Sequence, residues 1–427
     1  MRLIDQLLTR YLRTFNHKHM QLLPMEGFRP APAPGKKYLL YIHIPFCESL
    51  CPFCSFHRVR FDEERTRQYF AALRKEIGQY HEAGFIFDDV YVGGGTPTVL
   101  PDELAETLNL LRSLYELKSI SVETNPNHLQ QSTLNILKSA GVTRLSVGVQ
   151  SLDDTLLKEM GRFETYGSRE DIIEHIKLTQ GQFDTFNVDM IFNIPHQSES
   201  SLKQDIQILK DLAVDQISYY PLMPSDITER AMDKKMGHLD FRNERRFYDI
   251  IKESLLDDYE ASSAWCFSRK HSAIDEYIVD HDEYLGIGSG SFSYINNATY
   301  STTFSISHYV SLVQQGIPAI TSGRQMTINE QAQYDFLMHL FGLRMDTQPM
   351  IEKYGPHYQR LLWKELSFFK LIGALKERRD MYLVTERGMY YWVIMMREFF
   401  IGVNNFRSQM RGKIQDEWEV ITRMDKS

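Results

Sequence analysis

The chain has 427 residues, of which 43% are hydrophobic and 24% are charged, and its net charge is -8. This composition is too apolar for a disordered chain, and the length allows one large domain with a smaller one. The excess of acidic residues argues against a nucleic-acid-binding protein, which usually has a basic face. No run of about 18 apolar residues is present, so no membrane-spanning helix is expected. No export signal is visible at the N-terminus, so a cytoplasmic location is expected.

The chain begins with a segment of helical spacing, residues 1–20, and a proline-rich linker, residues 28–37, follows it. The apolar run "YLLYIHIPF" then predicts a strand that ends at Cys47. Apolar and β-branched residues predict five later strands, at 87–92, 119–126, 142–152, 186–195 and 215–224. Helical periodicity predicts the segments between the strands as helices, at 62–80, 101–115, 129–141, 168–182 and 201–213.

Six strands that alternate with helices predict an α/β fold with a parallel sheet, either an open barrel or a doubly wound sheet. After the glycine-punctuated segment 284–295, the chain becomes mainly helical and dense in aromatic residues. Residues 381–400 have the pattern of a strand, a turn and a helix. A second domain is therefore expected over residues 300–427.

Three of the four cysteines lie within eight positions, in the spacing C-x3-C-x2-C: Cys47, Cys51 and Cys54. In a reducing cytoplasm, clustered cysteines more often hold metal than form a disulfide. Structural zinc and cubane iron–sulfur sites usually have four protein ligands. The fourth cysteine, Cys266, is more than 200 positions away, and His43 and His57 lie close by, so a Cys3His zinc site is one alternative. The cysteines follow a strand, where a barrel places its chemistry.

This motif resembles that of the radical S-adenosylmethionine (SAM) enzymes. The longer string Tyr-x-His-Ile-Pro-Phe-Cys is similar to the branch of oxygen-independent coproporphyrinogen III oxidase, its heme-chaperone derivatives and related C-methyltransferases. The resemblance implies that Cys47, Cys51 and Cys54 bind a 4Fe-4S cluster whose fourth iron is left for SAM. It also implies a partial (β/α)6 barrel over residues 38–299, a smaller, mainly helical C-terminal substrate or lid domain over 300–427, and an N-terminal helix and linker over 1–37.

The same resemblance implies a set of cofactor contacts but assigns no catalytic side chain. Contacts to the cluster and the first SAM are implied for Tyr41, Phe53, Gly94, Gly95, Thr96 and Glu123. Contacts to a second SAM are implied for Gln150, Arg162 and Asp189. Asp189 lies in an apolar run and should be paired, with Arg162 as the expected partner. The alternatives are core aromatics at Tyr41 and Phe53 and a purely structural Arg–Asp pair.

Two departures from this branch bear on the substrate. Phe56 stands where the porphyrin-forming oxidase carries a further cysteine. Residues 273–278, "AIDEYI", keep only Tyr277 of the heme chaperones' H-N-x-x-Y-W box, although His271 and His281 lie nearby. The resemblance then favours a C-methyltransferase that uses two SAM molecules and a flavodoxin- or ferredoxin-type reductant. Its best-fitting acceptor is menaquinone, methylated at C8. The alternatives are a heme-opening methyltransferase, a coproporphyrinogen oxidase and a heme carrier.

The C-terminal region is rich in large apolar side chains: Trp363, Phe368, Phe369, Tyr390, Tyr391, Trp392, Met395, Met396, Phe399 and Phe400. These side chains predict either a helical core or a surface that covers an apolar substrate or meets the membrane at its inner face. Basic residues in the same region would support contact with anionic lipid: Lys364, Arg378, Arg379, Arg387, Arg397 and Arg407.

Overall fold

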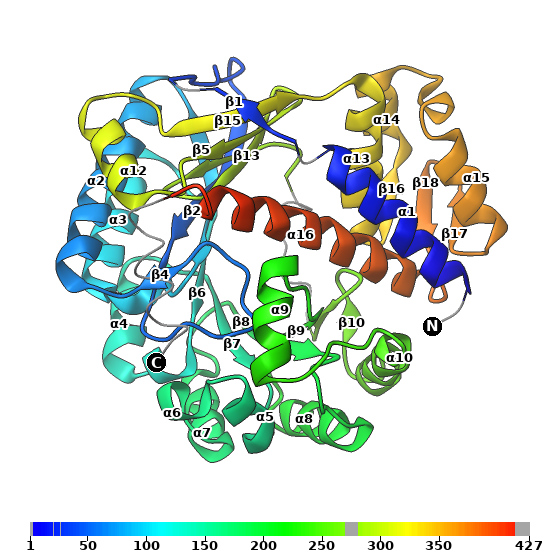
Figure 1. Cartoon of the computed structure of the whole chain (residues 1–427). Helices are drawn as coiled ribbons and strands as arrows, with labels where there is room; N and C mark the ends of the chain where they lie inside the picture. Colours follow the sequence, from blue (N-terminus) through cyan, green and yellow to red (C-terminus); the bar gives the residue numbers. More distant parts are fainter. Residues whose placement is uncertain (1–2, 20, 26, 270–280, 415–427) are drawn as a thin grey trace.

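The computed structural model describes residues 3–19, 21–25, 27–269 and 281–414. Within them, a thirteen-stranded sheet runs in the order β1-β15-β14-β13-β12-β2-β5-β6-β7-β8-β9-β11-β10 (Figure 1). Its parallel strands are β12 (Tyr284–Ile287), β2 (Lys37–Ile44), β5 (Ile86–Gly94), β6 (Ser119–Thr124), β7 (Arg144–Gln150), β8 (Thr185–Phe192) and β9 (Gln216–Pro221). All six predicted strands are present, and β12 extends the parallel part beyond β2.

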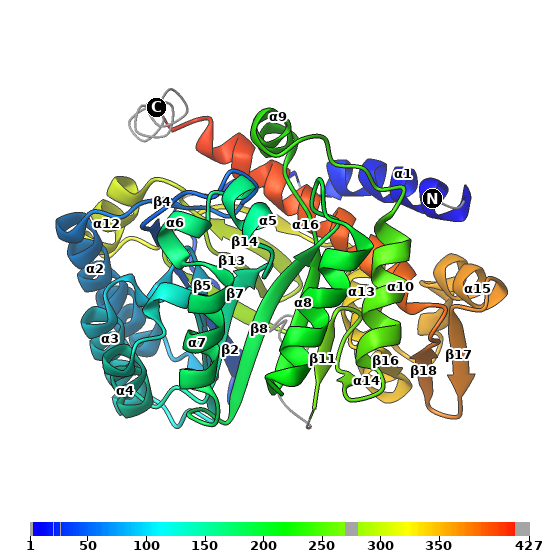
Figure 2. The same cartoon turned by 90° about the horizontal axis from the view of Figure 1, so that it is seen from below.

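Crossover helices connect the consecutive parallel strands and pack outside the sheet (Figure 2). They are α2 (Glu63–Glu82), α3 (Pro101–Leu114), α4 (Gln131–Ser139), α7 (Arg169–Thr179) and α8 (Glu199–Asp211). The start of α2 shows how the sequence defines them. The Asp62 carboxylate accepts a hydrogen bond from the Arg65 backbone N–H at 2.9 Å, and Glu63 and Glu64 suit the positive end of the helix dipole. The predicted α/β architecture is confirmed.

Antiparallel strands flank the parallel ones on both sides and leave an open, partial barrel. They are β13 (Phe292–Ile295), β14 (Ala298–Thr302), β15 (Ile320–Gln325) and β1 (Leu23–Pro24) on one side, and β11 (Cys266–Ser268) and β10 (Glu260–Ala261) on the other. The sheet continues through residue 300, because β14 pairs with both β13 and β15. The division of the chain into domains stays a prediction.

The C-terminal region is helical around a small antiparallel sheet in the order β16-β18-β17. Its elements are α13 (Ile328–Phe341), β16 (Arg344–Asp346), α14 (Thr347–Tyr354), α15 (Trp363–Leu371), β17 (Leu375–Arg378), β18 (Met381–Val384) and α16 (Met389–Arg411). The predicted strand, turn and helix at 381–400 therefore match β18 and α16. Figure 2 shows α16 crossing the mouth of the partial barrel, beside α9 and α1.

The remaining described elements are short or lie at the edges of the barrel. They are α1 (Leu3–His19), β3 (Phe46–Cys47), β4 (Val59–Arg60), α5 (Asp154–Glu159), α6 (Phe163–Tyr166), α9 (Asp226–Lys235), α10 (Glu244–Leu255), α12 (Ile306–Gln314) and the 3-10 helices Pro97–Val99, Pro126–His128 and Tyr358–Arg360. The helix α1 confirms the helix predicted at the N-terminus.

Most of the C-terminal aromatic side chains form core, as the first of the two alternatives predicted. Tyr390, Tyr391 and Trp392 are buried, whereas Trp363 stays 60% exposed. Two of the basic residues proposed for lipid contact, Arg397 and Arg407, are also buried, so that part of the prediction is wrong. In the part of the chain that the structure describes, no helix has the length and apolar character needed to cross a membrane.

Candidate functional site

A cavity of about 270 Å³ lies at the carboxyl ends of the parallel strands, beneath α16. Its wall contains every predicted cofactor contact and cluster ligand except Thr96. Thr96 is buried beside it, and its hydroxyl accepts a hydrogen bond from the Asn125 amide at 2.8 Å. The predicted residues therefore gather at the edge of the sheet where a barrel fold places its chemistry.

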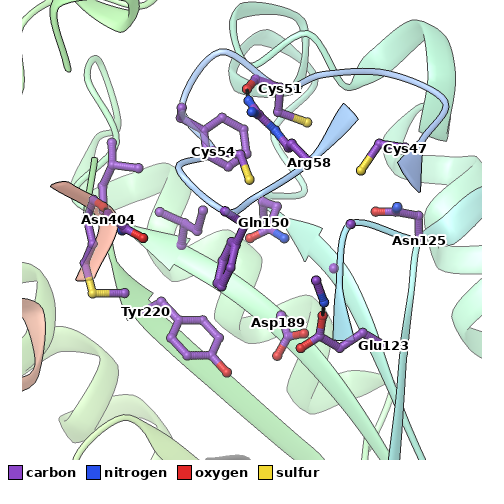
Figure 3. A pocket seen from close by; sticks show the side chains of 18 of the residues that line it. Cys47, Cys51, Cys54, Arg58, Glu123, Asn125, Gln150, Asp189, Tyr220 and Asn404 are labelled. Carbon is purple, nitrogen blue, oxygen red and sulfur yellow. Dashed lines mark hydrogen bonds between the residues drawn. The ribbon is translucent and has the colours of Figure 1, made fainter. Parts of the chain in front are cut away.

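The three clustered cysteines line one side of the cavity: Cys47 ends β3, and Cys51 and Cys54 lie in the loop before β4 (Figure 3). All three are free thiols, with Cys47 and Cys51 buried and Cys54 partly exposed. Burial, and next the nearby Cys54, raise the pKa of the Cys47 thiol to about 12. A bound cation is the ordinary way to hold such thiols as thiolates, because its charge offsets the cost of burying them.

Two guanidinium groups accompany this cysteine loop. Arg162 Nη1 lies 3.4 Å from Cys51 Sγ, and Arg58 donates to the Cys51 carbonyl. The buried Nε atoms of both arginines have no hydrogen-bond partner among the described residues. Donors placed in this way suit the thiolates of an iron–sulfur cluster and the carboxylate of SAM. The residues present therefore fit the cofactors that the sequence motif implies.

Neither nearby histidine is placed as a fourth cluster ligand. His43 Nε2 donates to the His57 carbonyl at 2.8 Å, so Nδ1 is the acceptor for the Tyr41 hydroxyl at 2.9 Å. Burial lowers the pKa of His43 to about 3, which keeps the ring neutral. His57 bonds through Nε2 to the Ser289 hydroxyl at 3.1 Å and lies outside the cavity wall. Cys266 is buried in β11 and also lies outside it, so the geometry does not support the zinc alternative.

The glycine loop after β5 packs directly against the cysteine loop. A Cβ atom on Gly95 would lie 2.7 Å from the Phe46 carbonyl oxygen and 2.9 Å from Cys47 Sγ, so only glycine permits this approach. Gly94 has φ +117 and its N–H donates to Glu123 Oε2 at 3.0 Å. The Tyr91 hydroxyl donates to the other oxygen of Glu123 at 2.9 Å. Glycine backbone and a fixed carboxylate thus line the cavity next to the cysteines.

Gln150, at the end of β7, and Asp189, within β8, form a second polar group. A bulge between Gly148 and Gln150 interrupts the pairing, and Gln150 has φ +77, in the left-handed region. Such strained residues concentrate at functional sites. The Asp189 carboxylate accepts hydrogen bonds from the Ser146 hydroxyl and the Asn187 amide, each at 2.7 Å.

The ion pair predicted between Arg162 and Asp189 is not the arrangement found. Arg162 Nη2 instead donates to Asn125 Oδ1 at 3.0 Å and to the Gly148 carbonyl. Both residues still line the cavity. The prediction failed because sequence places two side chains at the same edge of a sheet without showing which neighbours reach them first.

The part of the cavity away from the cysteines is mostly apolar. Its wall includes Met223, Trp265 and Phe400, with Tyr220 packed edge-on against Trp265 at a ring separation of 5.2 Å. Figure 3 shows Tyr220 and Asn404 on the side opposite Cys47 and Glu123. Cysteines and carboxylate at one end, and aromatic side chains at the other, divide the cavity into a cofactor region and a region suited to an apolar molecule.

Sequence reasoning missed several residues of this wall. Asn125 directly follows β6, so the rule that sites form at strand ends could have found it. Arg58 follows the cysteine motif closely, whereas Trp265 and Asn404 come from distant segments with no local signal. Residues 273–278 and His271 lie outside the described residues. His281 Nε2 lies 3.0 Å from Asp89 Oδ2, away from the cavity wall.

Comparisons with known proteins agree with this geometry. The family model described as "Radical SAM superfamily" matches residues 41–235. The heme chaperone HemW of Bacillus subtilis (strain 168) is 28% identical, over 82% of this chain and 95% of the relative. Oxygen-independent coproporphyrinogen III oxidase of Escherichia coli (strain K12) is 25% identical, over 80% of this chain and 79% of the relative.

The solved structure of the coproporphyrinogen III oxidase HemN from Escherichia coli has the same fold. The comparison of the two structures gives a TM-score of 0.71 and 22% sequence identity, and it covers 85% of this chain and 90% of the HemN chain. Residues 41–235 match the radical SAM superfamily model, and the chain is similar to the branch of coproporphyrinogen III oxidases and heme chaperones. A 4Fe-4S cluster and SAM, the cofactors of the matched superfamily, are also the cofactors that the cysteines and the cavity wall fit.

Proposed function

We propose that this protein is an enzyme that holds two SAM molecules in this cavity and modifies an aromatic small molecule beside them. The observation that carries the proposal is the composition of the cavity wall. It combines a cysteine and glycine region, a second polar group at Gln150 and Asp189, and an apolar region under α16. These three parts suit a cluster with one SAM, a second SAM and an acceptor.

The protein's part in the reaction is to bind, orient and exclude water. Cys47, Cys51 and Cys54 would hold the cluster. Gly94, Gly95 and Glu123 would hold the first SAM, and Gln150, Arg162 and Asp189 the second. When reduced, the cluster and its SAM supply a carbon-centred radical, chemistry that belongs to the cofactor. The apolar wall keeps water from that radical, because it offers few hydrogen-bonding groups. We further propose a flavodoxin- or ferredoxin-type electron donor.

For the acceptor, the lining of the cavity favours an apolar ring, and we propose methyl transfer to a quinone such as menaquinone as one candidate. The region beneath α16 is built from aromatic and aliphatic side chains. Phe56 replaces the further cysteine of the porphyrin-forming oxidase, and Asn404 and Arg407 are the polar side chains that α16 adds to the wall.

Tetrapyrrole chemistry is the second candidate, and the comparisons favour it over methylation. The printed names of the relatives are heme chaperone and oxygen-independent coproporphyrinogen III oxidase, and their similarity covers about four fifths of the chain. On this proposal, the apolar region takes a porphyrin-type macrocycle, and the product is a decarboxylated porphyrinogen, an opened heme or a carried heme.

One experiment separates these candidates. Anaerobically reconstituted protein is incubated with SAM carrying a labelled methyl group, a chemical reductant, and either menaquinone, coproporphyrinogen III or heme, and products are identified by mass spectrometry. Methyl transfer to menaquinone alone would support the first candidate. Consumption of either tetrapyrrole, with menaquinone unchanged, would support the second. Active SAM cleavage with none of the three acceptors changed, and with no heme retained by the protein, would contradict both.

Asp189→Asn should separate the two SAM-dependent steps. Because asparagine keeps the shape of aspartate but removes its charge, the cluster and the reductive cleavage of SAM without acceptor should stay near the wild-type rate. Product formation from the acceptor should fall by about tenfold or more, since a charged hydrogen bond contributes about 1.5–3 kcal/mol.

The matched control is Asp184→Asn, an exposed carboxylate just before β8 that should leave both rates unchanged. Equal loss of SAM cleavage and product formation in folded Asp189→Asn protein would contradict a separate role in binding the second SAM.

A further inference from the structure

The C-terminal half of α16 forms the roof of the cavity and is fastened to the loops around it. The Asn404 amide donates to the Met223 carbonyl at 2.8 Å, and the Ser408 hydroxyl donates to the Ser225 hydroxyl at 2.8 Å. The Ser225 backbone N–H in turn donates to the Ser55 hydroxyl of the cysteine loop at 2.9 Å. The position of this half of α16 is therefore fixed relative to both the cysteine loop and the end of β9.

Arg407 is a cation built into this roof. It is 6% exposed and lines the cavity. Its guanidinium carbon lies 4.8 Å from the ring centroid of Phe56 and 5.4 Å from that of Phe292, and Nη1 donates to Asn404 Oδ1 at 2.9 Å. Aromatic rings cover the faces of the guanidinium group, so its hydrogen bonds lie in its own plane. This arrangement holds a charged donor in one orientation.

The charges around the cavity are unevenly placed. The carboxylates of Glu123 and Asp189 belong to β6 and β8, on the side away from Asn404 (Figure 3). The other two cavity arginines, Arg58 and Arg162, donate to backbone and side-chain oxygens around the cysteine loop. Arg407 instead lies in the roof against Phe56 and Phe292, and burying a charge among aromatic rings is costly. A buried guanidinium group that lines the cavity suits a ligand whose oxygen can accept a hydrogen bond from it.

We propose that Arg407 is a specificity-determining residue that binds an electronegative oxygen of the acceptor, a carbonyl or a carboxylate. The inference rests on the proposed function, in that the acceptor occupies this cavity. With the oxygen at Arg407, the acceptor ring lies in the apolar region and one defined edge faces the polar groups at the strand ends. A quinone carbonyl and a porphyrin carboxylate share this chemistry, so the two acceptor candidates are separate arms of the test.

The test compares paired probes that differ in a carbonyl oxygen or in the charge of a carboxylate, using equilibrium dialysis against the anaerobically reconstituted holoenzyme with SAM bound. Menadione is paired with 2-methylnaphthalene, and coproporphyrin III with its tetramethyl ester. Wild-type protein should bind the oxygen-bearing or free-acid member of one pair at least tenfold more tightly. Arg407→Gln should reduce that preference to about twofold or less, because the loss of a charged donor costs about 1.5–3 kcal/mol.

Arg411→Gln is the matched control, because Arg411 lies one turn further along α16, donates to the Phe56 carbonyl at 3.4 Å and lies outside the cavity wall. It should keep the full preference. Iron content and the circular dichroism spectrum of Arg407→Gln protein are compared with those of the wild type to show that the variant is folded. If that variant loses its cluster, Arg407→Lys, which keeps the charge but not the planar fork, should show an intermediate preference.

The outcomes separate this inference from the proposed function. The role of Arg407 is overturned if the preference for the oxygen-bearing or free-acid probe persists in Arg407→Gln. The same holds if Arg407→Lys, used in place of an unfolded Arg407→Gln, keeps the full preference. Either result leaves the acceptor site in place. Failure of wild-type holoenzyme to bind any of the four probes contradicts the proposed acceptor class, and the inference falls with it. A preference confined to menadione or to coproporphyrin identifies which acceptor chemistry Arg407 serves.

Discussion

Replacing Cys47, Cys51 or Cys54 with alanine should abolish the iron–sulfur cluster and reduce SAM cleavage to background. The wild-type chain, reconstituted anaerobically, should hold about four iron and four sulfide per chain. Each of the three thiols lines the same cavity, and neither nearby histidine lies in its wall. A cluster that already lacks a fourth protein ligand tolerates no further loss. Iron and acid-labile sulfide analysis, with the spectrum of the reduced cluster, provides the measurement.

Cys266→Ala is the internal control for this result. Cys266 is buried in β11, outside the cavity wall. Its replacement should lower the free energy of unfolding only slightly, through lost packing of a core thiol, and should leave the cluster intact. Loss of the cluster in Cys266→Ala protein, or full iron content in folded Cys51→Ala protein, would show that the ligand set is wrong.

Those features of the site that depend on local sequence could be predicted. The six parallel strands follow from apolar runs that alternate with helical periodicity. Once the strands are known, the carboxyl ends of β5, β6, β7 and β8 must lie along one edge. That reasoning places Gly94, Glu123 and Gln150 together without any structure, whereas Asp189 was assigned from the family resemblance; the cavity contains all four.

Features that depend on long-range packing could not be predicted. Trp265 enters the cavity through β11, which pairs antiparallel with β9, and nothing near Trp265 in the sequence indicates that pairing. Asn404 and Arg407 enter because α16 crosses the mouth of the barrel. The aromatic residues of α16 indicated burial in general but not which surface they cover. Arg397 and Arg407 look like surface charges in sequence, and only tertiary contacts show that both are buried.

The position of α16 depends on a buried charge cluster centred on Arg397. The side chains of Arg397, Glu244 and Glu398 are all fully buried. Arg397 donates to Glu244 of α10 and, through Nη2 at 2.7 Å, to Glu398 Oε1. The Tyr390 hydroxyl donates to the same oxygen of Glu244 at 2.8 Å, and Arg13 of α1 reaches Glu398 at 2.8 Å. The carboxylates of Glu244 and Glu398 hold the pKa of Arg397 above its ordinary value in spite of burial.

Arg397→Met should therefore lower the free energy of unfolding by about 3–5 kcal/mol, because it keeps the length of the side chain but removes the cation of the buried Glu244 carboxylate and leaves Glu398 with Arg13. Denaturant-induced loss of helical circular dichroism measures the effect in the first unfolding transition. Arg378→Met, at an exposed position of β17, should change stability by less than about 0.5 kcal/mol. If Arg397→Met lowers the free energy of unfolding by less than about 1 kcal/mol, water must reach the buried charge cluster around Arg397. In that case, the hydrogen bonds of Asn404 and Ser408, rather than this charge cluster, would be the contacts that hold α16 over the cavity.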